Sequence, residues 1–471
     1  MEDFVFKDLS QTRADLLAGK YTAEELTRHY ATRASEKDEY NAFLEVFTSS
    51  ATDAAKALDQ KIASGKPVGR LAGAVIGIKD NMCYRGHGVT AASQILDSFE
   101  SVYTATSIQR LIDEGAIIIG RLNCDEFAMG SSNENSSFGP VKNPINPELV
   151  PGGSSGGSAA ALAADLCTVS LGSDTGGSIR QPAAFCGLVG LKPTYGRISR
   201  YGLIAFASSF DQIGPFAKSV DDAELVYQVM AGRDEMDSTS SARPVHEARS
   251  VKDKYTFAYY KEVLNNPGLH PRTKELFEAK LEALRAAGHE VIETSFPYLE
   301  HLVPCYYVLT TAEASSNLAR HDGVHYGRRS EASVDIPSTY YNSRTEGFGP
   351  EVKRRIMLGT FVLSAGYYDA YYSKGQKVRR LIKNATDDIL EKADFLISPT
   401  TPHPAFKTGE KANDPIALYL EDIFTVQANL AGNPAITVPM GTTDDGLPLG
   451  VQLLGRSFDE ATLFDGASLL S

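Results

Sequence analysis

Short apolar runs alternate with amphipathic stretches along most of this chain of 471 residues. The runs are rich in Val, Ile and Leu, and Gly, Pro or polar residues bound them. A continuous apolar run of this kind is typical of a strand that is covered on both faces. The pattern predicts strands at 71–79, 116–120, 168–171, 188–191, 255–260, 290–292 and 395–397.

The stretches between these runs carry the apolar spacing of helices. Residues 8–65 are helical in pattern, and Thr22-Ala-Glu-Glu resembles a capping box. Residues 231–252 are polar and predict a surface loop, and 460–470 predict a last helix without a capping signal at its end. The alternation of strands and helices indicates an α/β fold with a largely covered sheet. Further helices are expected at 104–114, 158–165, 178–185, 221–230, 271–287, 351–364, 370–393 and 418–431.

The composition is that of an ordinary soluble protein, with 42% hydrophobic and 22% charged residues. Lys and Arg number 46 against 59 Asp and Glu, which gives a net charge of −13. So acidic a chain is a poor candidate for the main nucleic-acid-binding surface of a complex, although it leaves room for a local basic patch.

Other features of the sequence exclude several classes of protein. The five cysteines are scattered and show no metal-ligand spacing, so we expect no metal site and reduced, buried thiols. The first residues, MEDFVFKDLS, lack the features of a secretory signal, and no apolar run is long enough to span a bilayer. We therefore expect a cytoplasmic protein without membrane contact, or a protein of the organellar matrix if the source is eukaryotic.

The most unusual stretch is 150–180, where two Gly/Ser clusters, 152–158 and 172–178, flank a short helix and a short strand. Clustered glycines let the backbone approach itself or a ligand closely. Exposed N–H groups at the start of a helix suit an anion or an oxyanion. Serines placed in two such loops indicate chemistry.

Three familiar glycine-rich patterns match this stretch only in part. In a phosphate-binding P-loop, Ser158 would stand where lysine is needed, and no strand precedes the loop. Residues 152–156 satisfy the G-x-S-x-G pattern of α/β-hydrolases, but the proline-containing segment 143–147 before them is no central strand. A flexible connector would not enclose an apolar helix and a buried strand.

A Ser–Lys mechanism is the fourth possibility for the stretch. Serine needs a base to become a nucleophile, and a lysine serves as that base only when burial keeps it neutral. Lys79 ends an apolar strand, where it is either a solvated strand-end lysine or such a base. No S-x-x-K occurs in the chain, which excludes the β-lactamase type of Ser–Lys site.

The clusters 152–158 and 172–182 and the strand-end pair Lys79-Asp80 resemble the amidase signature family over nearly the whole chain. The resemblance implies one large domain with a central mixed β-sheet covered by helices on both faces. Its parts would be peripheral N-terminal helices (1–65), the signature core (66–230), the surface loop (231–252) and the remainder of the sheet with the substrate pocket (253–471).

The resemblance also assigns roles to residues. Ser178 would be the nucleophile, Ser154 the relay and Lys79 the base, since the spacings of 75 and 24 residues fit the family's triad. The N–H groups of Thr175, Gly176 and Gly177 would hold the oxyanion. The Gly153–Ser154 peptide would be cis.

A narrower likeness joins the chain to the A subunits of tRNA-dependent amidotransferases. It is carried by 125–132, 193–216 and 312–318. It implies that Arg355 and Asp422 bind the carboxylate and the amino group of glutamine, that Tyr306 closes the pocket and that Gly130 contributes to it. From the sequence alone, Arg355 is equally part of a solvated charge run with Lys353 and Arg354.

The same likeness implies a function in a complex. This chain would hydrolyse glutamine and supply ammonia to convert misacylated Glu-tRNA(Gln), and possibly Asp-tRNA(Asn), to the amide form. It would need no cofactor itself, while a B subunit would bind charged tRNA and use ATP and Mg²⁺, and a small C subunit would complete a heterotrimer. A stand-alone amidase for small amides is the alternative, and a catalytically inactive scaffold is disfavoured because all three triad residues are present.

Overall fold

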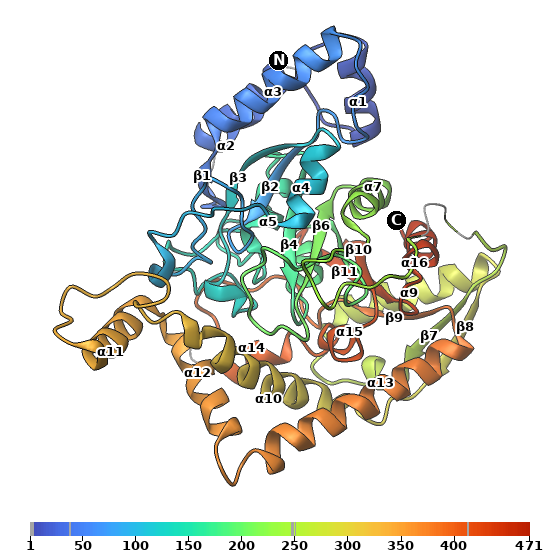
Figure 1. Cartoon of the computed structure of the whole chain (residues 1–471). Coiled ribbons are helices and arrows are strands. Elements are labelled where there is room, and N and C mark those ends of the chain that lie inside the picture. Colours follow the sequence, from blue (N-terminus) through green and yellow to red (C-terminus); the bar gives the residue numbers. More distant parts are fainter. Residues whose placement is uncertain (1–3, 37–38, 246–248, 250, 412–413) are drawn as a thin grey trace.

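One mixed sheet of eleven strands runs through the molecule (Figure 1). The computed structural model describes residues 4–36, 39–245, 249, 251–411 and 414–471. The pairs β2–β3, β2–β4, β7–β8 and β7–β9 are parallel, and the others are antiparallel. The expected single domain with a mixed sheet is confirmed. The strand order is β1 (Phe43–Val46), β3 (Ile117–Leu122), β2 (Val75–Lys79), β4 (Val169–Asp174), β6 (Gln212–Ala217), β5 (Val189–Lys192), β10 (Ala435–Thr442), β11 (Pro448–Leu454), β9 (Phe395–Pro399), β7 (Thr256–Tyr260) and β8 (Glu290–Thr294).

Helices cover both faces of the sheet, as predicted. Along β2, Ile76 and Ile78 enter one hydrophobic core and Val75 enters the opposite one, because successive side chains of a strand point to opposite faces. The first core is closed by α4 (Thr106–Asp113), α7 (Val220–Met230), α9 (Pro271–Ala286) and α16 (Glu460–Ser468). The opposite face is closed by α2 (Ala23–Glu36), α5 (Gly156–Ala163), α6 (Arg180–Phe185), α10 (Leu299–Asn317), α13 (Lys374–Lys392) and α15 (Val426–Ala431).

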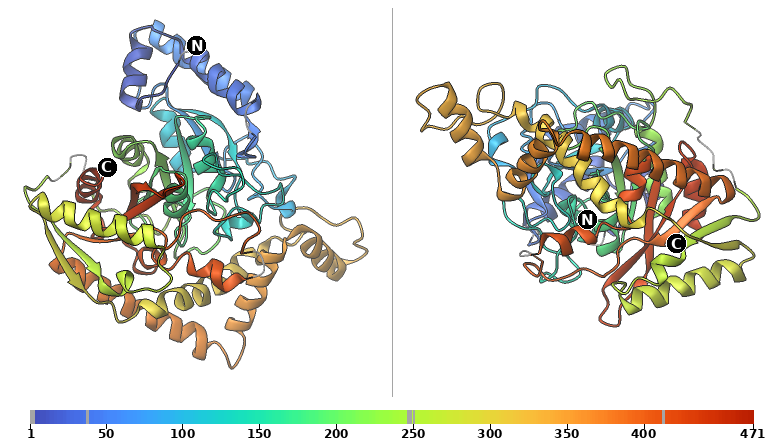
Figure 2. Two further views of the ribbon diagram at one scale, coloured as in Figure 1. Left: turned by 180° about the vertical axis from the view of Figure 1, so that it is seen from behind. Right: turned by 90° about the horizontal axis from the view of Figure 1, so that it is seen from below.

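The remaining helices are peripheral. Figures 1 and 2 place α1 (Leu9–Leu17), α2 and α3 (Thr48–Ala63) at the end of the molecule far from α13. The chain runs from α12 (Pro350–Leu363) through a π-helical turn, η4 (Asp369–Ser373), into α13, whereas α11 (Ile336–Gly347) lies at the left edge of Figure 1, away from α13. The other short elements are α8 (Lys261–Leu264), α14 (Pro415–Leu420) and the 3₁₀ turns η1 (Gln94–Leu96), η2 (Glu126–Ala128) and η3 (Leu318–Arg320).

The sequence pattern missed four strands, namely β1, β6, β10 and β11, and the helices α8, α10 and α11. Both β6 and β10 contain glycine and proline, which are usually excluded from central strands. The predicted helix 418–431 is wrong as one element, because residues 421–425 break it into α14 and α15. The apolar spacing continues through this break, so the pattern does not reveal it.

Other expectations can be compared with the described residues. All five cysteines are buried and unpaired. Residues 232–245, 249, 251 and 252 form neither helix nor strand, while 246–248 and 250, which belong to the predicted loop, lie outside the described residues. No helix in the described ranges has the length and apolar character needed to cross a bilayer.

Candidate active site

The sheet brings the predicted triad residues to one edge. Lys79 is the last residue of β2, and the parallel strand β4 beside it leads into the turn that carries Ser178. Carboxyl ends of neighbouring parallel strands meet at the same edge of a sheet, where ligands commonly bind. Ser154 lies in the glycine-rich loop before α5, and its peptide bond to Gly153 is cis, as the family resemblance implies.

The amine of Lys79 is fully buried and is surrounded by hydroxyl groups. Its Nζ lies 2.7 Å from Ser154 Oγ, 2.9 Å from Ser155 Oγ and 3.0 Å from Ser173 Oγ. No carboxylate within the described part of the chain forms an ion pair with it. Burial lowers the pKa of Lys79 to about 8, against the opposing pull of Cys124 and more distant acids. A substantial fraction of this amine is therefore neutral near physiological pH, and the alternative of a solvated strand-end lysine is wrong.

The hydrogen bonds around Lys79 indicate which hydroxyl proton its lone pair can accept. Ser155 Oγ donates its proton to the carbonyl of Ser173 at 3.1 Å, and Ser173 Oγ accepts a hydrogen bond from the side-chain amide of Asn81 at 2.9 Å. Ser155 therefore offers only a lone pair to Lys79, whereas Ser173 Oγ keeps its proton as well as a lone pair. A neutral amine has two N–H donors and one lone pair, so its lone pair is left for the proton of Ser154 or Ser173, and Ser154 makes the shortest contact, at 2.7 Å. This is the arrangement of a base that deprotonates Ser154.

Ser155, Ser173 and Asn81 were missed by the sequence reasoning. All three are buried and polar, and Asn81 and Ser155 are close in sequence to Lys79 and Ser154. A buried polar side chain needs a partner. Polar residues at the ends of fully apolar strands are thus the signal that points to this network.

Ser178 lies at the surface of the site and is 8% exposed. Its Oγ makes no hydrogen bond to any residue that the structure describes, and its carbonyl accepts one from the backbone N–H of Ser155 at 3.3 Å. The structure therefore brings Lys79 into contact with Ser154, but it shows no hydrogen bond between Ser154 and Ser178. Such contacts commonly tighten only when substrate binds.

The turn before Ser178 is held by a buried ion pair. Arg180 donates to both carboxylate oxygens of Asp174, at 3.0 and 3.1 Å. Burial raises the pKa of Asp174, but the charge and hydrogen bonds of Arg180, together with Lys192 and Asn429, outweigh it and lower that pKa. The N–H of Gly177 donates to Asp174 at 2.9 Å. Among the predicted oxyanion donors, Thr175 and Gly176 thus keep N–H groups unbonded within the described residues, whereas Gly177 does not in this conformation.

Tyr306 and Thr425 pack against the same turn so closely that only glycines fit. A Cβ on Gly176 would lie 2.5 Å from the Tyr306 ring, and one on Gly177, whose φ is +131°, would lie 2.3 Å from Thr425 Oγ1. Thr425 also donates a hydrogen bond to the carbonyl of Gly176 at 2.6 Å. Tyr306 therefore packs directly against the turn that carries the predicted oxyanion donors, while its role in closing the pocket stays a prediction.

Arg355 is buried, unlike its neighbour in the charge run. The side chain of Arg354 is 46% exposed and that of Arg355 only 4%. Arg355 Nε donates to Glu351 at 2.8 Å, and the rings of Phe206, Tyr307 and Tyr419 lie 5.3–5.8 Å from its guanidinium carbon. Its two terminal amino groups make no hydrogen bond to a described residue. The solvated-face alternative is wrong for Arg355, whose free end suits a carboxylate.

Asp422 supplies the opposite charge from the break between α14 and α15. One of its oxygens accepts from Ser131 Oγ at 2.8 Å, and burial raises the pKa of Asp422 to about 7. No ion pair joins Asp422 to Arg355 within the described residues, so each remains available to a ligand with both charges. Gly130 packs on Asp125, where a Cβ would lie 2.2 Å from the carboxyl carbon. This close packing leaves no room for a side chain at Gly130, whose contribution to the pocket stays a prediction.

Comparisons with known proteins agree with this site. A family profile described as Amidase matches residues 25–464. The A subunit of the glutamyl-tRNA(Gln) amidotransferase of Chlorobium phaeobacteroides is 52% identical, covering 99% of this chain and 98% of its own length. That of Koribacter versatilis is 51% identical, with 97% and 96% covered.

Solved structures of two such proteins have a similar fold. The A subunit of the glutamyl-tRNA(Gln) amidotransferase from Thermotoga maritima is 40% identical, with a TM-score of 0.80 over 98% of this chain and 94% of that one. The peptide amidase of Stenotrophomonas maltophilia is 28% identical, with a TM-score of 0.83 over 99% and 97%.

The pH dependence of amide hydrolysis tests the neutral lysine. A protonated Lys79 has no lone pair, so kcat/KM is expected to fall about tenfold per pH unit below about pH 8, the pKa of Lys79. A second fall is expected below about pH 7, where Asp422 becomes protonated. Measuring kcat/KM from about pH 6 to 10 for the protein and for Asp422→Asn separates the two falls. The variant lacks the carboxyl group of Asp422, so its profile should show only the fall caused by protonation of Lys79. A flat profile across pH 8 in both proteins contradicts a neutral Lys79.

Proposed function

Because the chain belongs to the amidase family, we propose that it is the glutamine-hydrolysing A subunit of a tRNA-dependent amidotransferase. The observation that carries this proposal is the combination of a buried lysine beside Ser154 with two opposite charges, Arg355 and Asp422, that are not paired with each other. The lysine–serine pair would cleave an amide, and the two charges would bind the carboxylate and the ammonium group of a free amino acid. The names of the relatives that are about half identical over the full length support the same function.

In the proposed reaction, Arg355 binds the carboxylate of glutamine and Asp422 binds its ammonium group. Lys79 takes the proton of Ser154 as Ser154 takes that of Ser178, and Ser178 Oγ forms a bond to the side-chain amide carbon. The N–H groups of Thr175 and Gly176 stabilise the oxyanion that develops on the amide oxygen. The proton then returns through Ser154 to the amide nitrogen, the C–N bond breaks and ammonia leaves.

The second half repeats these steps with water. The first half leaves a glutamyl ester on Ser178. Lys79 and Ser154 deprotonate a water molecule that attacks the ester, and the proton goes back to Ser178 as glutamate departs. The ammonia would convert the misacylated glutamyl group of Glu-tRNA(Gln), and possibly the aspartyl group of Asp-tRNA(Asn), to the amide.

The partners and cofactors are part of the proposal. A B subunit would bind most of the charged tRNA and activate its ester with ATP and Mg²⁺, and a small C subunit would complete the heterotrimer. This chain would need no cofactor, since a lysine and two serines suffice for its reaction. The complex would work in the cytoplasm, where charged tRNA is used.

Dependence on partners tests the function directly. Glutamine hydrolysis is measured for this chain alone and after addition of the B and C subunits, ATP, Mg²⁺ and misacylated tRNA. We expect these additions to couple ammonia release to formation of Gln-tRNA(Gln). If the lone chain instead cleaves varied small amides rapidly and ignores glutamine, it is a stand-alone amidase.

Replacing the proposed nucleophile isolates the covalent step. Ser178→Ala is expected to lower glutamine hydrolysis by at least about 10³-fold, because no other hydroxyl can form the ester. Rapid acid quenching and mass spectrometry should detect one added glutamyl group in the protein and none in Ser178→Ala. Ser158→Ala is the matched control, since Ser158 Oγ donates only to the carbonyl of Leu171. An equal loss in both variants would remove Ser178 from the mechanism.

Two neighbouring arginines, one buried and one exposed, allow a controlled test of glutamine binding. Arg355→Lys removes the planar fork that suits a carboxylate, so KM for glutamine is expected to rise about 10- to 100-fold, with a smaller change in kcat. Arg354→Lys makes the same substitution one residue earlier, on an exposed side chain, and KM should stay within about twofold. The site assignment is wrong if the two variants have equal KM values.

A further inference from the structure

A row of four basic residues runs along the N-terminal half of α13. Lys374, Lys377, Arg380 and Lys383 follow one another at intervals of three residues, so each lies beside the next on the helix surface. The row is about 14 Å long, since each residue of an α-helix rises about 1.5 Å. The side of α13 that carries Gly375, Ile382 and Leu390 is buried. Each step of three residues turns about 60° around the helix axis, so Lys374, Lys377 and Arg380 share the exposed side, whereas Lys383 lies on the flank beside the cavity and is half-buried.

Most of this row is not neutralised by the protein. Lys374, Lys377 and Arg380 form no ion pair with any described residue, and only Lys383 is paired, with Asp387 at 2.8 Å. A typical solvent-exposed helix face instead alternates charges of both signs. Three unpaired cations in seven residues are unusual in a chain whose net charge is −13.

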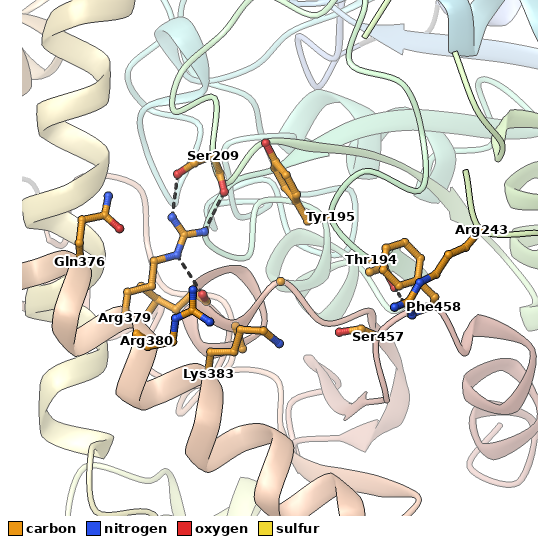
Figure 3. Close-up of a pocket in the computed structure, with 13 residues that line it drawn as sticks. Thr194, Tyr195, Ser209, Arg243, Gln376, Arg379, Arg380, Lys383, Ser457 and Phe458 are labelled. Carbon is orange, nitrogen blue, oxygen red and sulfur yellow. Dashed lines mark hydrogen bonds between the residues drawn. The ribbon is translucent and has the colours of Figure 1, made fainter. Parts of the chain in front are cut away.

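The row borders a cavity of about 740 Å³ that is itself basic (Figure 3). Arg379, Arg380 and Lys383 contribute to one side of it, and Arg243 lies against the ring of Phe458 elsewhere in its lining. No aspartate or glutamate lines this cavity, while hydroxyls and backbone groups of other segments do. The triad residues are not among the lining, so this is a second site.

The cavity wall is built firmly. Arg379 donates hydrogen bonds to the carbonyl of Leu430 at 3.0 Å and to the hydroxyl and carbonyl of Ser209 at 2.7 and 2.8 Å. Phe458 adopts the left-handed conformation, with φ of +69°, which is uncommon for a residue other than glycine. Its ring lies between Arg243 and Arg197, at 4.6 and 4.8 Å from their guanidinium carbons.

We propose that the α13 row and the adjoining cavity bind the phosphate backbone of RNA. Three unpaired cations on the exposed side of one helix, continued by the cations that line the cavity, match a polyanion, and arginine is well suited to phosphate oxygens. The inference rests on the proposed function, in which charged tRNA is the RNA that this chain meets. The row would contact the tRNA body in addition to the main tRNA-binding surface on the B subunit, and it would take no part in glutamine hydrolysis.

Binding of labelled tRNA to the full chain, measured by fluorescence anisotropy over a range of salt concentrations, tests this site. The wild-type protein is expected to bind, with affinity falling as salt rises. A variant with Lys374→Gln, Lys377→Gln, Arg380→Gln and Lys383→Gln should bind at least about tenfold more weakly at low salt. Its plot of log affinity against log salt should be shallower by about 3 to 4, because about one phosphate contact is lost per cation.

The control removes the same charge elsewhere. Lys20→Gln, Lys56→Gln, Lys61→Gln and Lys66→Gln change four exposed lysines among the N-terminal helices, at the far end of the molecule. This control should keep the wild-type affinity and slope. The proposal would be overturned if the wild-type protein did not bind tRNA, or if both variants lost the same affinity for tRNA. It would also be overturned if the wild-type protein bound polyglutamate as tightly as tRNA.

Glutamine hydrolysis separates this inference from the proposed function. Both quadruple variants should hydrolyse glutamine at the wild-type rate, which also confirms that they fold. A protein that binds tRNA through α13 but releases no ammonia from glutamine would contradict the proposed function and leave the RNA site standing. A lower rate in the α13 variant alone would contradict the separation of the two sites.

Discussion

The site depends on burying the amine of Lys79 without giving it a carboxylate. An acid in contact with Lys79 would keep the amine charged and remove its lone pair. Buried acids near the site are held by other groups. Asp80 accepts from Arg121 at 3.0 Å, and Asp174 is held by Arg180. Asp125 accepts from the backbone N–H groups of Asn133 and Asn135 at 2.9 and 3.0 Å. The three hydroxyls around Lys79 satisfy its hydrogen bonds while leaving it free to lose a proton.

The same constraint explains why the site needs almost the whole chain. The base comes from β2, and the turn with the nucleophile follows β4. That turn is fixed from the far end of the sequence, because Arg180 donates to the carbonyl of Thr425 at 2.8 Å and to Asn429 at 2.8 Å. The break at 421–425 therefore contributes the carbonyl of Thr425 to this turn and places Asp422 beside Ser131.

Much of this was predictable from the sequence, and the remainder has physical causes. Apolar runs that end in polar residues indicated the strands β2 and β4 and the position of Lys79. The strands β6 and β10 were missed because Pro215 and Pro439 interrupt their pattern, and only pairing with neighbours shows that they are strands. The sequence cannot tell Arg355 from Arg354, since burial depends on which face of α12 meets the rings of Phe206 and Tyr307.

The chain uses lysine and arginine for different tasks, and their chemistry dictates the choice. A guanidinium does not lose its proton in a protein, so burial among aromatic rings leaves Arg355 charged. Burial instead lowers the pKa of an ammonium, so that Lys79 can lose its proton near neutral pH. Exchanging the two residues would leave a base that holds no lone pair and a substrate site without a fixed charge. Burial alone thus does not define the function of a cation here, because its intrinsic pKa decides whether it becomes a base or an anchor.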